Sequence, residues 1–270
     1  MDNSTPESLL ASADAPVRRV ERPRRDPSRS RASGVTWQAE KSLATRNQIL
    51  EATLQCLVEL GYTQTTTEKI AQKAGVSRGA MTHHFKSRAE VFNAAAEYII
   101  DLRAAEYEDA VKRIKLPPGE TPTYEAMLET LEVLQKYYYG RPTFIALQEL
   151  QRGARTDAEL QAVLTPLEAA LDERKSATLL KRFPYWIEYQ ETSEVLRDLM
   201  FHALKGVATN PAPYMKGDRL RKLHQLLARV GMMEMEKAYQ ATHGGEMPKP
   251  AAEADLEPVK KPRKSRKVEA

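Results

Sequence analysis

The sequence predicts an all-α protein. Apolar residues recur at spacings of three and four through most of residues 45–241, which is the period of one helix face. Over the same range, no segment alternates apolar and polar residues as a half-buried strand does. Glycine and proline fall between the periodic stretches, where helices end. These patterns predict a short unit of three helices followed by a longer helical part.

The first expected helix covers residues 45–60 and ends at Gly61. Its apolar side consists of Ile49, Ala52, Thr53, Cys56, Leu57 and Leu60. Cys56 is the only cysteine of the chain and lies on this side. We therefore expect a buried, inert thiol and no intrachain disulfide, as is usual in a reducing, cytoplasmic setting.

The second expected helix covers residues 66–74. Thr66 is the preferred N-cap, and Thr65 with Glu68 offers an alternative capping box. Gly75 follows and supplies the left-handed backbone that a sharp turn requires. The segment therefore predicts a helix that ends in a tight turn.

A third, short helix is expected over residues 78–85, with Ser77 as its cap. Ser87 and Glu90 then have the S-x-x-E spacing of a capping box. This spacing predicts a fourth helix over residues 88–114, which the segment "LPPG" ends.

The later helices are expected over residues 122–139, 142–153, 157–182, 191–209 and 217–241. Pro166 should kink or split the helix that contains it. The last two helices are amphipathic, and the second has Leu220, Leu223, Leu227, Val230 and Met233 with Glu234 along one side. Two long apolar stripes at the end of a helical chain favour packing between subunits.

Both ends of the chain are predicted to be disordered basic tails, over residues 1–40 and 244–270. Such tails either increase solubility or bind nucleic acid nonspecifically through its phosphates. Between them, residues 41–95 carry seven Lys and Arg against four Asp and Glu, whereas residues 96–245 carry twenty against twenty-two. A basic module before a slightly acidic one is typical of a polyanion-binding module joined to another with a different task. No apolar run is long enough for a membrane span, and the N-terminus lacks the pattern of a signal peptide.

The three helices expected within residues 45–85 have the arrangement of a helix-turn-helix. In that motif two helices are joined by a short turn, and the second lies in the major groove of DNA. The sequence therefore indicates a DNA-binding unit.

The segment "TRNQILEATLQCLVELGYTQTTTEKIAQKAGVSRGAMTHHFKSRAEVF", residues 45–92, resembles the DNA-binding domain of the TetR family of bacterial transcriptional regulators. The resemblance implies a helix-turn-helix domain over residues 41–92. The following residues, 93–243, agree in length and helicity with the family's effector-binding and dimerisation domain. The family default is a repressor that binds a palindromic operator as a dimer and is released by a small organic effector.

Carried over position by position, the resemblance implies DNA contacts from Thr45, Arg46, Thr66, Ser77, Arg78, Gly79, Thr82, His83, Lys86 and Arg88. Thr66 caps the second helix, and Arg88 stands where many relatives have a phosphate-facing lysine. Thr82 departs from the pattern, because many relatives have a tyrosine there. Thr82 can still meet a phosphate or a thymine methyl group, so the operator contacts are expected to differ.

The adjacent histidines His83 and His84 do not predict a metal site. Neighbouring helical positions point about 100° apart, and helical zinc pairs use four-residue spacing. We expect His83 to contact DNA and His84 to pack near Phe85. The sequence also has no nucleophile elbow and no phosphate-binding glycine loop, so we expect no catalytic residue, no cofactor and no enzyme.

For the effector, we expect an apolar or amphipathic small molecule held between helices of residues 93–243. The candidate lining residues are Tyr138, Phe144, Leu147, Gln151, Trp186, Phe201 and His202. Ordinary core packing is the alternative role for each of them. The helices near 191–209 and 217–241 are expected to form the homodimer. The alternative function is a ligand-independent architectural or assembly protein that binds DNA through its basic tails.

Overall fold

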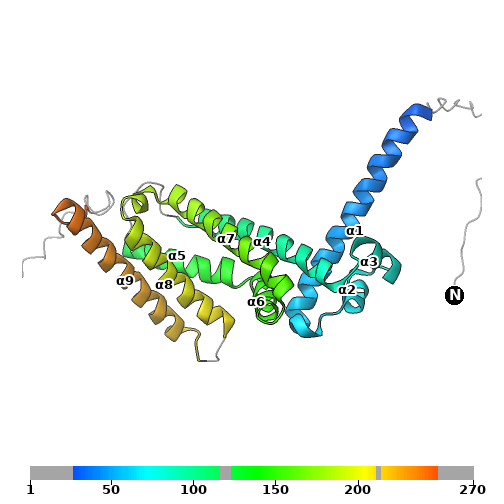
Figure 1. The fold of residues 1–270 in the computed structure, drawn as a ribbon. Helices are drawn as coiled ribbons and strands as arrows, with labels where there is room; N and C mark the ends of the chain where they lie inside the picture. Colours follow the sequence, from blue (N-terminus) through cyan, green and yellow to red (C-terminus); the bar gives the residue numbers. More distant parts are fainter. Residues whose placement is uncertain (1–26, 116–122, 211–213, 249–270) are drawn as a thin grey trace, which may run out of the picture. The chain divides into compact units, whose positions relative to one another are not determined.

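The computed structural model describes residues 27–115, 123–210 and 214–248 of the 270-residue chain, with side chains from residue 37 onward. Within these ranges every regular element is a helix, as the sequence predicts (Figure 1). Residues 1–45 and residues 46–270 form two compact units, which are described separately. Among the described helices, none combines the length and apolar character that crossing a bilayer demands.

Helix α1 spans Pro27–Gln64 and begins well before residue 45, where the sequence pattern placed it. Residues 27–40, expected to be disordered, are therefore helical. Proline suits the first helical turn, and the Ala, Arg, Gln, Glu and Lys residues that follow are good helix formers. Gly61, with φ 78° and ψ 170°, interrupts α1 where the sequence predicts the helix to end. The other residues of the two predicted tails, 1–26 and 249–270, lie outside the described residues.

Helix α2 spans Thr67–Ala74 and is capped by Thr66, whose hydroxyl accepts a hydrogen bond from the Lys69 amide. The alternative cap at Thr65 is not used, because its buried hydroxyl donates to the Gly61 carbonyl at 2.7 Å. Gly75 ends the helix in the left-handed conformation, at φ 65°. The local signals for this segment are thus confirmed.

Helix α3 spans Arg78–His84 and α4 spans Arg88–Lys112. Ser77 caps α3 by accepting from the Ala80 amide, and Ser87 caps α4 by accepting from the Glu90 amide. Both caps are as predicted. The "LPPG" segment that was expected to end α4 lies outside the described residues.

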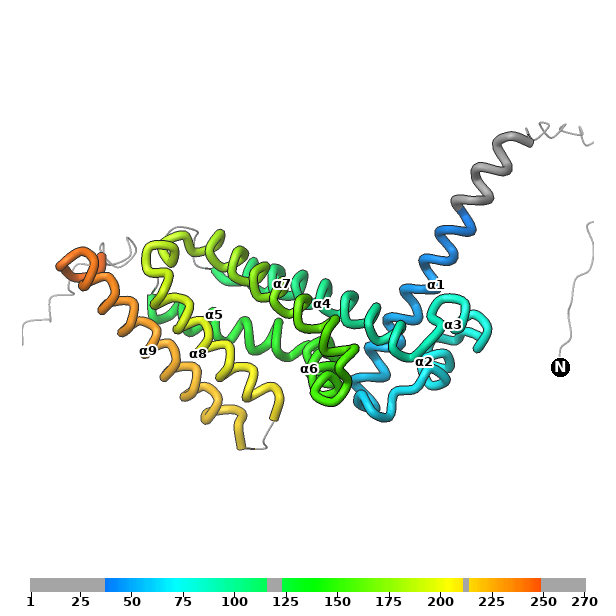
Figure 2. The backbone as a smooth tube through the Cα atoms, viewed as in Figure 1, coloured from blue at the N-terminus to red at the C-terminus, as the bar shows by residue number. Residues whose placement is uncertain are grey.

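The remaining helices are α5 (Tyr124–Leu134), the π-helix η1 (Gln135–Tyr139), α6 (Pro142–Ala154), α7 (Ala158–Arg182), the 3₁₀-helix η2 (Pro184–Ile187), α8 (Gln190–Thr209) and α9 (Asp218–His243). The predicted helix over 122–139 is therefore an α-helix that changes to a π-helix. Of the kink or split expected at Pro166, the split does not occur, because α7 continues through this residue. Helix α4 packs along α7, and α5 packs along α9 (Figure 2).

Two apolar cores hold these helices. The first joins the residues of α1 from Ile49 onward, α2, α3 and most of α4 to α6 and the first part of α7. The second joins the end of α4 to α5, η1, α8 and α9. Cys56 is buried in the first core, and burial raises the pKa of its thiol, as expected for an inert packing residue.

The apolar stripe of α9 lies largely within the chain itself. Leu227 is buried in the second core, and Leu223 and Val230 pack against it. Part of the stripe that was expected to favour packing between subunits therefore packs within the chain. Other apolar side chains of the last two helices are exposed: Val195 and Leu199 on α8, and Leu226 and Met233 on α9.

Candidate nucleic-acid interface and effector cavity

Helix α3 has one buried side and one exposed side. Met81 and the following Phe85 are buried in the first core and fix the helix against α1 and α2. Arg78, Thr82 and His83 are exposed on its other side. A rigidly packed short helix thus presents one arginine, one hydroxyl and one imidazole outward, which are groups able to meet phosphates and base edges.

Ser77, Gly79 and Lys86 are also exposed and flank the same helix. The Ser77 hydroxyl is used as the cap of α3, and the Thr82 hydroxyl donates to the Arg78 carbonyl at 2.9 Å. Thr82 therefore retains its methyl group and the oxygen lone pairs for an outside contact, and Arg78 is an exposed residue.

His83 and His84 stack, with ring centroids 5.3 Å apart and planes inclined by 14°. His84 is half-buried, and burial, followed by the charges of His83 and Arg46, lowers the pKa of its imidazole. Within the described ranges, no group of three or more His, Cys, Asp or Glu side chains is placed to hold a metal ion.

Three further residues expected to contact DNA lie outside α3: Thr45, Arg46 and Thr66. Arg46 sits over the Phe85 ring at 4.7 Å, which links α1 to the end of α3. Thr66 is engaged as the cap of α2, and the Thr45 hydroxyl donates to the Lys41 carbonyl within its own unit.

Arg88 differs most from its expected role. Its guanidinium donates to the carbonyls of Thr65 (3.2 Å) and Tyr62 (2.7 Å), and it stacks on the rings of Tyr62 (4.4 Å) and Phe92 (4.3 Å). All of these contacts are internal. Instead of standing free to meet a phosphate, Arg88 ties the first turn of α4 to the turn between α1 and α2.

Tyr62 extends this connection to α6 and α7. Its amide donates to Glu149 at 3.1 Å, and its hydroxyl donates to Asp157, the cap of α7, at 2.7 Å. The ring also lies against Gly153, where an added Cβ would be 2.6 Å from it. Tyr62 and Arg88 therefore bind the helix-turn-helix to three helices of the larger helical part.

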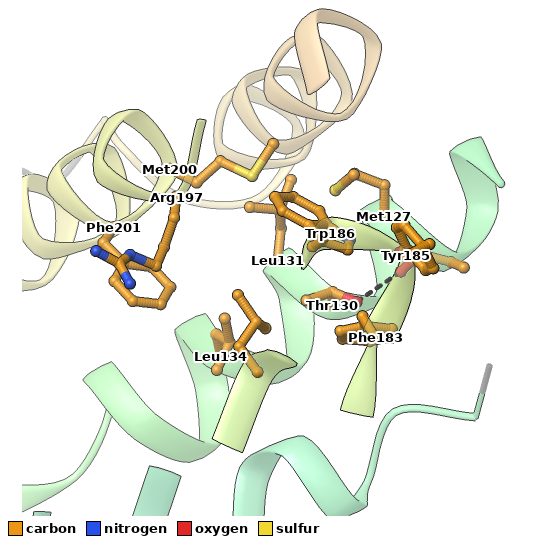
Figure 3. Close-up of a pocket in the computed structure, with 12 residues that line it drawn as sticks. Met127, Thr130, Leu131, Leu134, Phe183, Tyr185, Trp186, Arg197, Met200 and Phe201 are labelled. Atoms are coloured by element: carbon orange, nitrogen blue, oxygen red, sulfur yellow. Dashed lines mark hydrogen bonds between the residues drawn. The ribbon is translucent and has the colours of Figure 1, made fainter. Parts of the chain in front are cut away.

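A small cavity of about 40 Å³ lies between α5, η2, α8 and the end of α7 (Figure 3). Its described lining residues are Ala126, Met127, Thr130, Leu131, Leu134, Leu179, Phe183, Tyr185, Trp186, Arg197, Met200 and Phe201. In Figure 3, Arg197 and Phe201 lie on one side of the view, Phe183 and Tyr185 on the other, and Trp186 between them.

Only Trp186 and Phe201 of the seven expected ligand residues line this cavity. Tyr138 and Phe144 belong to the surrounding core, and Leu147 belongs to the other core. Gln151 is paired with Glu168, and His202 is exposed, with its ring nitrogen bonded to the Asp198 carbonyl. The residues missed, such as Met127 and Arg197, carry no local signal, because only packing between distant helices brings them together.

The short capped helices α2 and α3, joined at Gly75, form a helix-turn-helix, the motif whose second helix lies in the major groove of DNA in DNA-binding regulators of transcription. Residues 49–95 match the family model of bacterial regulatory proteins of the tetR family. This match covers most of the segment, residues 45–92, that resembles the family's DNA-binding domain.

Relatives named as transcriptional regulators are similar to this chain over longer stretches. An uncharacterised HTH-type transcriptional regulator of Mycobacterium tuberculosis is 29% identical over 199 residues, which cover 70% of this chain and 96% of that protein. The HTH-type transcriptional repressor AcnR of Corynebacterium efficiens is 30% identical over 135 residues, which cover 50% of this chain and 63% of that repressor. A TetR family transcription regulator from Marinobacter aquaeolei has the same fold, with a TM-score of 0.51 at 19% identity over 72% of this chain and 97% of that one.

Proposed function

We propose that the protein is a ligand-responsive repressor that binds a palindromic DNA operator as a homodimer and leaves it when a small organic effector binds. The observation that carries this proposal is the exposed side of α3, where Arg78, Thr82 and His83 stand on a helix fixed by Met81 and Phe85. Residues 41–92 would read DNA, and residues 93–243 would bind the effector and form the dimer.

The exposed apolar residues of α8 and α9 support a homodimer. Val195 is 66% exposed and Leu199, one turn later, is 46% exposed; on α9, Leu226 is 50% and Met233 46% exposed. Pairs spaced by four and seven residues lie on one side of a helix, so each helix presents an apolar strip. Such strips are commonly covered by another chain, and a two-fold dimer places the same surface of both copies together.

A dimer of this kind presents two copies of α3 about one DNA turn, roughly 34 Å, apart. An effector that favours a conformer with a different spacing weakens DNA binding, and it needs several kcal/mol of differential affinity to do so. Helix α4 is the element expected to transmit this change to the helix-turn-helix, because it directly follows α3 and reaches the second core. The contacts of Arg88 and Tyr62 make the helix-turn-helix follow any shift of α4, α6 or α7.

Genomic footprinting of the bound sites tests the DNA part of this proposal. We expect recurrent inverted repeats with half-sites one helical turn apart, upstream of a small number of genes. Scattered binding without a shared sequence would instead support the alternative, a ligand-independent architectural protein that binds through its basic tails.

Sedimentation analysis tests the dimer. The double variant Leu199→Asp, Leu226→Asp places charges on both apolar strips and is expected to sediment as a monomer with unchanged helix content. The matched control, Ile145→Asp, changes an exposed apolar residue of α6 and should leave the mass of a dimer. A native chain that sediments as a monomer at micromolar concentration would contradict this part of the proposal.

A further inference from the structure

Arg103 is a charged side chain in the interior of the larger helical part. It lies on α4, is 1% exposed, and is the largest fully buried side chain in the described part of the chain. Its Nε is buried without a hydrogen-bond partner, which costs free energy. A buried ion pair also adds little net stability, because desolvation offsets the attraction. Stability alone therefore does not account for an arginine at this position.

The contacts of Arg103 join α4 to η1. Its Nη1 donates to the Tyr138 carbonyl at 2.7 Å, and its guanidinium carbon lies 3.5 Å from the centroid of the Tyr138 ring. Element η1 is a π-helix, a rare form that is often found at functional sites. Gly140 ends it, and an added Cβ there would lie 2.7 Å from the Lys136 carbonyl oxygen, so the turn is tightly closed. Because η1 continues α5, Arg103 fixes α4 to the end of a helix that lines the cavity.

Glu106 extends these contacts to α6. One oxygen of its carboxylate, Oε2, accepts from Nη1 of Arg103 at 3.0 Å and from the Thr143 hydroxyl at 2.6 Å. Thr143 lies in the first turn of α6, and the N-cap residue of this helix, Arg141, makes no side-chain cap. A carboxylate beside the start of a helix is also favoured by the helix dipole. Arg103 and Glu106 therefore hold the first turn of α6 against α4.

The later turns of α6 hold Tyr62. Oε2 of Glu149 accepts from the Tyr62 amide at 3.1 Å, and an added Cβ on Gly153 would lie 2.6 Å from the Tyr62 ring. Thr143 and Glu149 belong to this one helix and are separated by about 9 Å along its axis. A shift or rotation of α6 at its first turn therefore moves the groups that support Tyr62, which leads into the helix-turn-helix.

We propose that Arg103 is a positioning residue for operator binding. Buried within the helices, it touches no DNA; through Glu106 it holds α6 in the place from which Glu149 and Gly153 support Tyr62 and so the helix-turn-helix. This role rests on the proposed function, since operator affinity is the property that Arg103 would control. A role in core packing alone would change stability and leave the operator affinity of the folded protein unchanged.

Arg103→Met in the full chain tests this role, because methionine is unbranched and apolar but cannot donate to Tyr138 or Glu106. Affinity for the palindrome found by footprinting is measured at a temperature where circular dichroism shows both proteins to be fully folded, and it should fall roughly three- to thirtyfold. Hydrogen exchange without DNA should become faster at the Tyr62 amide and in the first turn of α6. The matched control, Val111→Ala, removes buried volume from the same helix and should lower stability while leaving both measurements unchanged.

Two further variants test the route through α6. Thr143→Val removes only the hydroxyl that binds Glu106 and keeps the shape of the side chain, so it serves if Arg103→Met does not fold. Its operator affinity should fall roughly twofold, with faster exchange of the Tyr62 amide. Glu149→Ala removes the acceptor of that amide. Thr143→Val or Arg103→Met should therefore cost much less operator affinity in the Glu149→Ala chain than in the native chain.

Unchanged operator affinity or unchanged Tyr62 exchange in the folded variants would overturn the role of Arg103. Fully additive losses on combination with Glu149→Ala would overturn it as well, since independent sites add. A native chain that prefers no DNA sequence would overturn the proposed function, and this role with it. That last result comes from the native chain alone, so the two failures are distinguished.

Discussion

The hydroxyl of Tyr62 donates a hydrogen bond of 2.7 Å to Oδ2 of Asp157. Asp157 also caps α7, with its other carboxylate oxygen accepting from the Leu160 amide at 3.1 Å. One side chain thus joins the segment that leads into the helix-turn-helix to the first turn of α7. The bond from Tyr62 is the largest cause that lowers the pKa of the Asp157 carboxyl below its usual value.

Replacing Tyr62 with phenylalanine should weaken the protein and reduce its sensitivity to acid. Loss of the hydrogen bond is expected to lower the free energy of unfolding by about 1 kcal/mol at neutral pH. Because the folded pKa of Asp157 is depressed, its contribution to stability is complete above the usual pKa of 3.8 and is lost as the pH falls through the lower folded value. Urea unfolding between about pH 5 and pH 3 should therefore show a shallower loss in Tyr62→Phe than in the native chain.

Tyr98→Phe is the matched control, because the Tyr98 hydroxyl donates to Glu51 on α1 rather than to Asp157. This variant should keep the acid response that depends on Asp157. An identical pH dependence in the native chain and in Tyr62→Phe would show that the bond to Asp157 does not stabilise the fold.

Arg88→Lys separates the internal role of Arg88 from a role in phosphate binding. Lysine keeps the charge but cannot reproduce the fork that reaches two carbonyl groups and stacks on two rings. We expect a loss of about 1–3 kcal/mol in the free energy of unfolding, with the operator affinity of the folded fraction nearly unchanged. Denaturant unfolding and fluorescence anisotropy measure the two effects. Unchanged stability with weaker operator binding would restore Arg88 to the DNA contacts that its position in the family implies.

The sequence predicts the caps and turns of the first helices but not the contacts of Arg88. Caps and turns depend on neighbouring residues, so Thr66, Gly75, Ser77 and Ser87 were all predicted correctly. The partners of Arg88 lie 23 and 26 residues away, and no local pattern encodes them. The cavity is even harder to predict from the sequence, because its wall comes from four segments of the chain and only packing places Arg197 in it.

Gly79→Ala should stabilise the protein while weakening its binding to the operator. Gly79 lies in the first turn of α3, and an added Cβ would meet only the Ser77 hydroxyl, at 3.8 Å. Alanine in place of an exposed helical glycine is expected to raise the free energy of unfolding by roughly 0.5–1 kcal/mol. In the proposed complex the methyl group would stand between the first turn of α3 and the DNA, so anisotropy should report a lower operator affinity. A stabilised variant with full operator affinity would mean that this turn does not approach the DNA closely.

Operator recognition by α3 is tested most directly with two DNA duplexes of equal length and composition at one salt concentration. One carries the palindrome found by footprinting, and the other carries the same bases scrambled. The native chain should prefer the palindrome by a factor of about 10³ or more. Arg78→Ala is expected to lose roughly ten- to hundredfold in affinity for the palindrome, whereas the surface control Arg174→Ala should retain it. Equal affinity of the native chain for both duplexes would contradict the claim that α3 reads an operator.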